Sequence, residues 1–553
     1  MSQAMKLLVI GGVAAGASCA ARARRLCETA EITVLERGPD VSFANCGLPY
    51  HVGGEIPTRD VLAVQTPATL KGLLNLDVRT RCEAVRIDRA GKRVEVKNLV
   101  DGSSEWLSYD KLMLSPGASP IRPPIPGIDD QRIFTLRSLE DMDRVIAATE
   151  AGMRAVAIGA GFIGLEMAEQ LHHKGLSVEL VELQKQVLPQ LDKKMTMLLE
   201  SELRHHEIGV TLGDGIECFV PTPDALECHL KSGKVLKADF VVLSMGVKPD
   251  TQIARDAGLT LGPRGHVVVD HFQRTSDPDI YAAGDAVETE ELVFGDRIAL
   301  PMGGPANRQG RVAADHMLRP GAAHPYPGSL GTAIVRVFDV AAGVTGWTEK
   351  RMRDANKPCA SVIVNDHQHA TYFPGAKPLT LKLVWDTRDG RVVGAQATGG
   401  EGVDKRLDVI AACIQGKATI DDLCHLELAY APPFGSAKDI INLAGFAATN
   451  MRDGLFEQAG ELPFGDAQIV DVRPKPVADA FPLTGAINIP FPTLRANLDK
   501  LDRSKPVITV CAFGKMSYFA ARVLAQNGFQ VKSFSGGIKG NIDPRSPAKL
   551  PTA

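Results

Sequence analysis

The sequence predicts an α/β protein with two Rossmann-like units, a strand-rich α+β region after them, and a small α/β unit at the C-terminus. Two glycine-rich turns, each standing between an apolar strand and a helix, predict the Rossmann-like units. Short strands dominate from about residue 322, and residues 464–553 return to alternating strands and helices. The length of 553 residues allows three or four domains at roughly 150 residues each.

The composition excludes several classes of protein. The 62 Lys and Arg residues nearly balance the 65 Asp and Glu residues, so the net charge of −3 gives no basic footprint for nucleic acid. The uncharged run Leu7–Ala21 is too short and too rich in glycine for a membrane span or a secretory signal. Ten cysteines are too sparse for a disulfide framework. We therefore expect a cytoplasmic protein with free thiols and with neither a membrane nor a nucleic-acid partner.

The first unit begins with the apolar strand Leu7–Ile10 and the turn Gly11-Gly12-Val13-Ala14-Ala15-Gly16. Small residues let the backbone approach a pyrophosphate, and the N-terminus of the next helix attracts its charge. A second strand, Glu31–Leu35, ends at Glu36, which can accept a hydrogen bond from a ribose hydroxyl. Val13 replaces the middle glycine of G-x-G-x-x-G, so an ordinary strand–helix turn is the alternative for this copy.

The second copy matches the dinucleotide fingerprint in full. The strand Val156–Ile158 enters Gly159-Ala160-Gly161-Phe162-Ile163-Gly164, and a second strand, Ser177–Val181, leads to Glu182. A carboxylate there favours NADH because it repels the 2′-phosphate of NADPH, although Lys185 makes this preference less than absolute. Two such sites in one chain indicate a bound flavin and a passing nicotinamide nucleotide.

A third segment connects the two units. Thr275–Asp285 reads as a turn, a short strand and an acid at a loop-to-helix junction, and Ser115-Pro116-Gly117 lies where the chain would cross between domains. Together with the glycine turns, these segments resemble the pyridine nucleotide-disulfide oxidoreductases. The resemblance implies an FAD-binding domain formed by residues 1–117 and 249–321, interrupted by an NAD-binding domain at 118–248.

The same resemblance implies two sets of cofactor contacts. For FAD they are Gly11, Gly12, Ala15, Gly16, Glu36, Arg37, Ser115, Pro116, Gly117, Gly284, Asp285, Pro301 and Ala306. For NADH they are Gly159, Gly161, Phe162, Ile163, Gly164, Glu182 and Gly246.

Residues 322–450 resemble the dimerisation domain of that family, which implies a homodimer. Short strands are expected at Val335–Phe338, Ser361–Val364, Thr380–Trp385 and Val392–Ala395, and helices near Arg406–Gln415 and Lys438–Ala448. Asn450–Pro463 has two glycines and few apolar residues, which predicts a linker.

Residues 464–553 resemble a rhodanese domain. Strands are expected at Ile469–Arg473, Thr484–Pro490 and Val507–Val510, the last running directly into Cys511. Cys511–Ser517 has the length of a rhodanese active loop, whose backbone N–H groups stabilise a thiolate or a persulfide anion. Met516 replaces the usual arginine, and Lys515 supplies a charge. We expect Cys511 to carry sulfur; an inactive rhodanese fold is the alternative.

Cys46 is the central prediction. In Ser42–Tyr50, dithiol members of the family carry two cysteines separated by four residues, but His51 occupies the second position here. The segment resembles the single-cysteine branch of coenzyme A disulfide reductases, NADH oxidases and peroxidases, and persulfide reductases. A lone thiol forms a mixed disulfide, a persulfide or a sulfenic acid. The resemblance implies that Cys46 lies beside the flavin with a lowered pKa.

The alternative for any cysteine is that of a small buried hydrophobe. We accept it for Cys27, Cys82, Cys218, Cys228, Cys359, Cys413 and Cys424, and their spacing predicts no zinc site.

Coenzyme A is the expected thiol ligand. Tyr372 and Tyr430 match two tyrosines that members using coenzyme A contribute from the partner subunit, one of which assists the leaving thiol. Val13–Ser18 lacks the histidine typical of peroxidases. The remaining coenzyme A contacts implied are Ser18, Arg22, Arg25, Ser42, Asn45, Lys71, Asn307 and Lys438. Solvated arginines on a helix face and packed tyrosine rings are the alternatives.

The expected activity is an FAD- and coenzyme A-dependent reductase that uses NADH. Its substrates would be the sulfur–sulfur bonds of a persulfide, a polysulfide or coenzyme A disulfide, reduced at Cys46, while Cys511 handles sulfane sulfur. An NADH oxidase or peroxidase acting through a Cys46 sulfenic acid is one alternative, and a sensor of redox or sulfur status is another.

Overall fold

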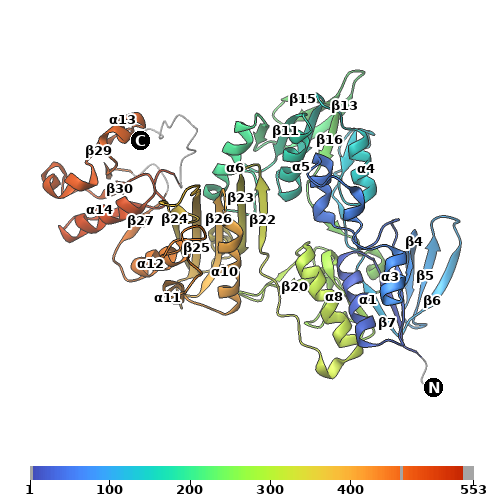
Figure 1. Ribbon diagram of the computed structural model, residues 1–553. Coiled ribbons are helices and arrows are strands. Elements are labelled where there is room, and N and C mark those ends of the chain that lie inside the picture. Colours follow the sequence, from blue (N-terminus) through green and yellow to red (C-terminus); the bar gives the residue numbers. More distant parts are fainter. Residues whose placement is uncertain (1–3, 461–464, 540–553) are drawn as a thin grey trace. The chain divides into compact units, whose positions relative to one another are not determined.

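The computed structural model describes residues 4–460 and 465–539 (Figure 1). Their contacts divide the chain into two compact units. The first comprises Met1–Leu183 and Gly213–Gly331, and the second comprises Gln184–Leu212 and Thr332–Ala553. The α/β fold class is confirmed, while the limits given above for the individual domains stay predictions.

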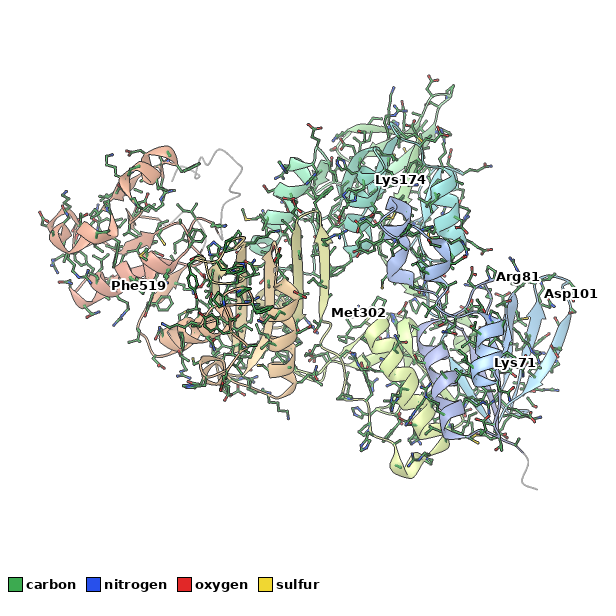
Figure 2. The ribbon with its side chains drawn as sticks, in the orientation of Figure 1. Lys71, Arg81, Asp101, Lys174, Met302 and Phe519 are labelled. Carbon is green, nitrogen blue, oxygen red and sulfur yellow. The ribbon has the colours of Figure 1, made fainter. Side chains whose placement is uncertain are left out.

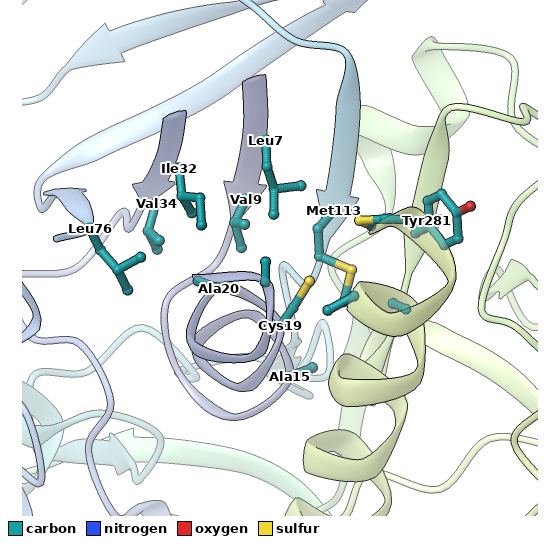
Figure 3. Close-up of a cluster of buried hydrophobic side chains, with 14 of the residues drawn as sticks. Leu7, Val9, Ala15, Cys19, Ala20, Ile32, Val34, Leu76, Met113 and Tyr281 are labelled. Atoms are coloured by element: carbon teal, nitrogen blue, oxygen red, sulfur yellow. The ribbon is translucent and has the colours of Figure 1, made fainter. Parts of the chain in front are cut away.

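The first unit contains the parallel sheet that carries the first glycine turn. Its order is β19-β7-β1-β2-β3, with bounds Ile280–Ala282, Lys111–Leu114, Lys6–Ile10, Glu31–Leu35 and Asp77–Arg79. Helices α1 (Ala14–Leu26) and α8 (Gly303–Leu318) lie side by side against it. Figure 3 shows Leu7, Val9 and Val34 of the sheet facing Cys19 and Ala20 of α1 in a buried cluster. Burying this apolar surface fixes the strand–turn–helix unit.

A second parallel sheet repeats the arrangement. It contains β11 (Ser177–Glu182), β10 (Arg154–Ile158), β16 (Phe240–Leu243) and β9 (Ile133–Thr135), with helix α5 (Phe162–His173) following β10. Its apolar core includes Val156, Ile158, Val241 and Leu243. Both predicted strand–turn–helix–strand units are therefore present.

Smaller elements complete the first unit. The sheets are β4-β5-β6 (Cys82–Asp88, Arg93–Asn98, Ser104–Ser108), β13-β14-β15 (Ile216–Pro221, Leu226–Leu230, Val235–Ala238), β17-β8 (Val247–Pro249, Ala118–Pro120) and β18-β20-β21 (Val267–Val268, Val287–Glu290, Arg297–Ile298). The helices are α2 (Leu48–Gly53), α3 (Pro67–Leu74), α4 (Leu139–Ala147) and α7 (Gln252–Asp256).

The second unit contains an antiparallel sheet. Its order is β22-β23-β26-β25-β24, with bounds Ala333–Val337, Val340–Gly346, Val392–Gly399, Pro378–Asp386 and Cys359–His367. The helices are α6 (Lys193–His205), α9 (Glu349–Asp354), α10 (Val403–Gln415), α11 (Ile420–Cys424) and α12 (Ile440–Arg452). Strand β23 was not expected from the sequence.

A second sheet of this unit is parallel, in the order β27-β31-β30-β28-β29. The bounds are Glu457–Ala459, Val531–Phe534, Val507–Val510, Gln468–Asp471 and Ala486–Asn488, with helices α13 (Lys475–Ala480) and α14 (Lys515–Gln526). The predicted linker Asn450–Pro463 needs correction, because it includes the end of α12 and strand β27, which pairs with β31. Residues 461–463 of that linker lie outside the described residues.

Within the described residues, no helix has both the length and the apolar composition needed to cross a bilayer.

Candidate active site

The first glycine turn holds the backbone and a carboxylate close together. Gly12 N donates to Glu36 Oε2 at 2.8 Å, and Gly38 N donates to Glu36 Oε1 at 2.9 Å, so Glu36 is fixed beside the turn. A Cβ on Gly16 would lie 1.8 Å from Gly11 O, which only glycine avoids. Among the described residues, the N-terminus of α1 has no side-chain cap. Its N–H groups therefore face a cradle that fits a pyrophosphate.

The second turn repeats this geometry. Ala160 N donates to the buried Glu182 Oε2 at 2.8 Å, and a Cβ on Gly164 would lie 1.8 Å from Gly159 O. Gly161 precedes α5, which likewise lacks a side-chain cap in the part of the chain that the structure describes. Phe162 and Ile163 begin the helix. The two turns therefore fit two dinucleotides, as expected for FAD and NADH.

A serine supports each turn. Ser115 Oγ donates to Ile10 O at 2.8 Å, and Ser244 Oγ donates to Gly159 O at 2.8 Å and to Ile158 O at 3.0 Å. Ser115 was predicted from the sequence, whereas Ser244 was not. The signal was present, because both strands end in Leu-Ser-x-Gly, at Leu114–Gly117 and at Leu243–Gly246.

Asp285 lies in the one-turn 3-10 helix Gly284–Ala286, which leads into β20 and not into a helix. Burial raises the pKa of Asp285, and the charges of Arg137 and His266 partly offset this. Arg137 Nη2 lies 3.4 Å from Asp285 Oδ2. Gln309, on the same helix as the predicted Ala306, accepts from Gly284 N at 2.8 Å. A half-buried acid held this way can accept hydrogen bonds from a polyhydroxyl chain.

Cys46 lies in the 3-10 helix Asn45–Gly47, directly before α2, and its side chain is exposed. Its pKa is raised, first by the desolvation of the thiol among protein atoms and then by the charges of Glu166 and Asp285. This is opposite to the expected lowering. The loss of hydration of the sulfur is the largest of these causes, and the expected lowering did not include it. The chain alone therefore favours the neutral thiol at Cys46.

The residues predicted to bind coenzyme A in the first unit are partly brought together. Ser18 Oγ donates to Asn307 Oδ1 at 2.7 Å, which joins α1 and α8. Arg22 pairs with Asp315 on α8, with 2.6 Å between Nε and Oδ1, whereas Arg25 is exposed. Lys71, on α3 (Figure 2), donates to Asn75 Oδ1 at 2.7 Å. Arg22 can therefore bind a phosphate only in competition with Asp315.

The other predicted site residues of the first unit have contacts and exposures that do not identify a ligand. Ser42 N donates to Gly12 O at 2.9 Å, and Asn45 begins the 3-10 helix of Cys46. Arg37 is exposed and lies 3.6 Å from Asp250. Pro301 and Gly246 are exposed, and Ala15 and Ala306 are buried.

In the second unit, Tyr372 and Tyr430 meet through their hydroxyl groups, which lie 2.8 Å apart. The side chains are 74% and 48% exposed, so neither is a packed core ring. The hydrogen bond between the two hydroxyl groups raises the pKa of Tyr372. Lys438 is exposed and lies eight positions along the chain from Tyr430. A pair of exposed phenols of this kind can donate to a departing thiolate.

Cys511 follows β30 and is buried, with 4% of its surface exposed. Gly514 N and Ser517 N donate to its sulfur at 3.1 and 3.2 Å. Gly514 has a φ of +92°, a left-handed conformation that suits glycine and turns its N–H inward. Lys515 and Met516 begin α14, which also carries Phe519 (Figure 2). The backbone of the loop thus directs two N–H groups at the sulfur, an arrangement that would favour an anionic form.

One cluster was not expected from the sequence. Glu55, Glu169 and His173 have potential ligand atoms that all lie within 4.8 Å of one another. Glu55 and His173 form an ion-pair contact at 3.6 Å. Glu169 is buried, whereas Glu55 and His173 are exposed, and an exposed acid–histidine contact needs no metal ion.

Comparison with protein families accounts for nearly the whole chain. Residues 5–309 match the pyridine nucleotide-disulphide oxidoreductase model, 332–439 match the dimerisation domain of that family, and 457–541 match the rhodanese-like domain. The chain belongs to the pyridine nucleotide-disulphide oxidoreductase family. It is therefore an oxidoreductase that carries a dimerisation domain and a rhodanese-like domain.

Among family members, the chain resembles coenzyme A disulfide reductase of Staphylococcus epidermidis, with 33% identity over 80% of this chain and 99% of the relative. It also resembles reduced CoADR-RHD of Bacillus anthracis, with a TM-score of 0.94 and 41% identity over 97% of this chain and 98% of the other. A NAD-dependent persulfide reductase from A. fulgidus gives a TM-score of 0.93 and 40% identity over 97% of this chain and 100% of the other.

Proposed function

We propose that the protein is an FAD-containing, coenzyme A-binding reductase that uses NADH to reduce coenzyme A disulfide, persulfides or polysulfides. The observation that carries the proposal is the presence of two different cysteine sites in one family member. Cys46 is a solitary exposed thiol near the predicted flavin acid, and Cys511 is a buried thiol that accepts two backbone hydrogen bonds. The relatives act on the same class of bond. A homodimer in the reducing cytoplasm belongs to the same proposal.

Residues of the chain would perform the sulfur chemistry at Cys46. Its thiolate attacks one sulfur of the substrate, which forms a Cys46–S bond and expels a thiolate from the broken S–S bond. By the family resemblance, Tyr372 or Tyr430 of the partner subunit would supply a proton or hydrogen bond to that leaving sulfur. FAD, when bound, supplies the two electrons that it takes from NADH, so that the Cys46 disulfide is reduced and a second thiol is released. Glu36 and Asp285 would hold the FAD, and Glu182 would hold the NADH.

Cys511 would accept a sulfane sulfur from a donor persulfide. The donor S–S bond breaks, a persulfide forms on Cys511, and the donor leaves as a thiol. The two N–H groups that reach the Cys511 sulfur favour the anionic form of that persulfide.

The variant Cys46→Ser tests the proposal in the full chain. NADH consumption with coenzyme A disulfide or a small persulfide should fall by about a thousandfold or more, because the attacking atom is lost. Cys82→Ser, a half-buried cysteine of the same unit, is the control and should retain turnover. Wild-type turnover in Cys46→Ser would refute the proposal. Faster turnover with oxygen or peroxide than with any sulfur substrate would favour the oxidase or peroxidase alternative.

A further inference from the structure

The Cys511 loop is held from outside the rhodanese-like sheet. Asn365, on strand β24, directs its Nδ2 to Phe513 O at 3.1 Å and to Gly536 O at 2.7 Å. Both carbonyls belong to the segments that surround Cys511. Asn365 is itself oriented by Thr380, its cross-strand partner on β25, whose Oγ1 donates to Asn365 Oδ1 at 2.6 Å.

One peptide unit connects Asn365 to the reactive sulfur. The Phe513 carbonyl accepts from Asn365, and the N–H of the same peptide, on Gly514, donates to Cys511 Sγ at 3.1 Å. Hydrogen bonding to a peptide carbonyl polarises its N–H, and each bond in such a chain strengthens the next by roughly 10–30%. It also fixes the plane of the peptide, which decides where that N–H points.

The other carbonyls of the loop are also held away from the sulfur. Ile538 N donates to Cys511 O, and Lys539 N donates to Ala512 O, both at 2.9 Å. Ser517 Oγ donates to Gly514 O at 2.8 Å. Among the carbonyls of residues 511–514, that of Phe513 accepts its hydrogen bond from a residue of another sheet, Asn365 on β24. The position of the Phe513–Gly514 peptide therefore depends on β24.

We propose that Asn365 is a positioning residue for the Cys511 sulfur, acting through the Phe513–Gly514 peptide so that a strand of the dimerisation domain tunes the sulfur-carrying loop. The proposal rests on the role proposed above for Cys511. It adds that the anionic sulfur needs this side chain as well as the backbone of its own loop.

The experiment uses the full-length protein with its bound cofactors. Asn365→Ala removes both hydrogen bonds, and Asn365→Asp keeps the acceptor for Thr380 but removes the donor. Thr380→Val only loosens the asparagine, so it gives a milder test if either substitution at Asn365 prevents folding. Asn450→Ala is the matched control, because Asn450 Nδ2 donates to Tyr518 Oη at 3.1 Å and so joins the same two domains without touching the Phe513–Gly514 peptide.

Two readouts follow Cys511 by peptide mass spectrometry. One is the pH profile of its alkylation by iodoacetamide, and the other is the lifetime of a persulfide loaded from glutathione persulfide without NADH. In both variants at Asn365, alkylation at pH 7 should slow about threefold to tenfold, with its profile moved to higher pH, and the persulfide lifetime should shorten. Thr380→Val should change less in the same direction, and Asn450→Ala should match the wild type.

Three outcomes would overturn the proposal. If both variants at Asn365 show the wild-type alkylation profile and persulfide lifetime, Asn365 does not position the Cys511 sulfur. If those variants do not fold, wild-type behaviour of Thr380→Val leads to the same conclusion. Equal changes in Asn450→Ala would show that Asn365 only joins the two domains. By contrast, a wild-type protein that accumulates no persulfide on Cys511 would refute the sulfur-carrying role, while the alkylation profiles would still decide the role of Asn365.

Discussion

Cys46 and Cys511 present the same thiol in opposite surroundings. Cys511 is buried and accepts hydrogen bonds from two backbone N–H groups, whereas Cys46 is exposed and lies within the influence of two carboxylates. Hydrogen bonds to a charged group are worth about 1.5–3 kcal/mol each, and nearby acids act against a thiolate. The rhodanese-like loop therefore offers backbone hydrogen bonds to a sulfur anion. The Cys46 segment does not, so activation there depends on what binds beside it.

Removing the Cys511 sulfur should have the largest effect that separates the two sites. In Cys511→Ser, NADH turnover with polymeric sulfur should fall by about tenfold or more, since the carrier atom is lost, while coenzyme A disulfide turnover should stay within about twofold. Parallel assays of NADH consumption with both substrates give the measurement. Cys359→Ser should change neither rate, and an equal loss with both substrates would mean that the sites do not act separately.

A backbone substitution should disturb Cys511 alone. Gly514→Ala places a side chain at a φ of +92°, which costs about 1–2 kcal/mol and turns the N–H away from the sulfur. The persulfide held on Cys511 should decrease several-fold, whereas Cys46-dependent turnover should persist. Gly528→Ala is the matched control, because its φ of +81° imposes similar strain at the far end of α14. If the two variants lose the same amount of persulfide, strain and not N–H geometry explains the effect.

The smallest change concerns the charge near Cys46. Its pKa is raised in part by Glu166, so the thiolate fraction at neutral pH is low and increases as the pH rises. Glu166→Gln removes one of these charges, lowers the pKa of Cys46, and should accelerate its alkylation at pH 7 by about twofold to fivefold. Peptide mass spectrometry of the full chain, with and without added FAD, can follow this. Glu140→Gln should have no effect, and slower alkylation in Glu166→Gln would contradict the electrostatic explanation.

Much of the fold could be predicted because its signals are local. The two strand–turn–helix units follow from apolar strands and small residues, and the Cys511 loop follows from its length and from the strand before it. Strand β23 was not predicted because Val340–Gly346 is rich in glycine and alanine, which weakens a strand pattern. Strand β27 was not predicted because it is short and carries the polar residues Glu457 and Gln458.

The site was less predictable because its energetics depend on contacts between distant segments. The raised pKa of Cys46 arises first from desolvation of the thiol among protein atoms and then from Glu166 and Asp285, which are far from it in the sequence. The contact of Asn365 with the Phe513 carbonyl joins residues 148 positions apart, and no local pattern indicates it. Ser244 differs from these, since the repeated Leu-Ser-x-Gly could have identified it.

The separate roles of the two cysteines are tested most directly by loading sulfur onto Cys511 first and adding NADH afterwards. Wild-type protein and Cys46→Ser are incubated with glutathione persulfide without NADH, then chased with NADH, and the sulfur on Cys511 is followed by mass spectrometry. Both proteins should load Cys511, and NADH should clear that sulfur from the wild type but not from Cys46→Ser. Clearance by NADH at the same rate in Cys46→Ser would contradict the account, because electrons would then reach Cys511 without passing through Cys46.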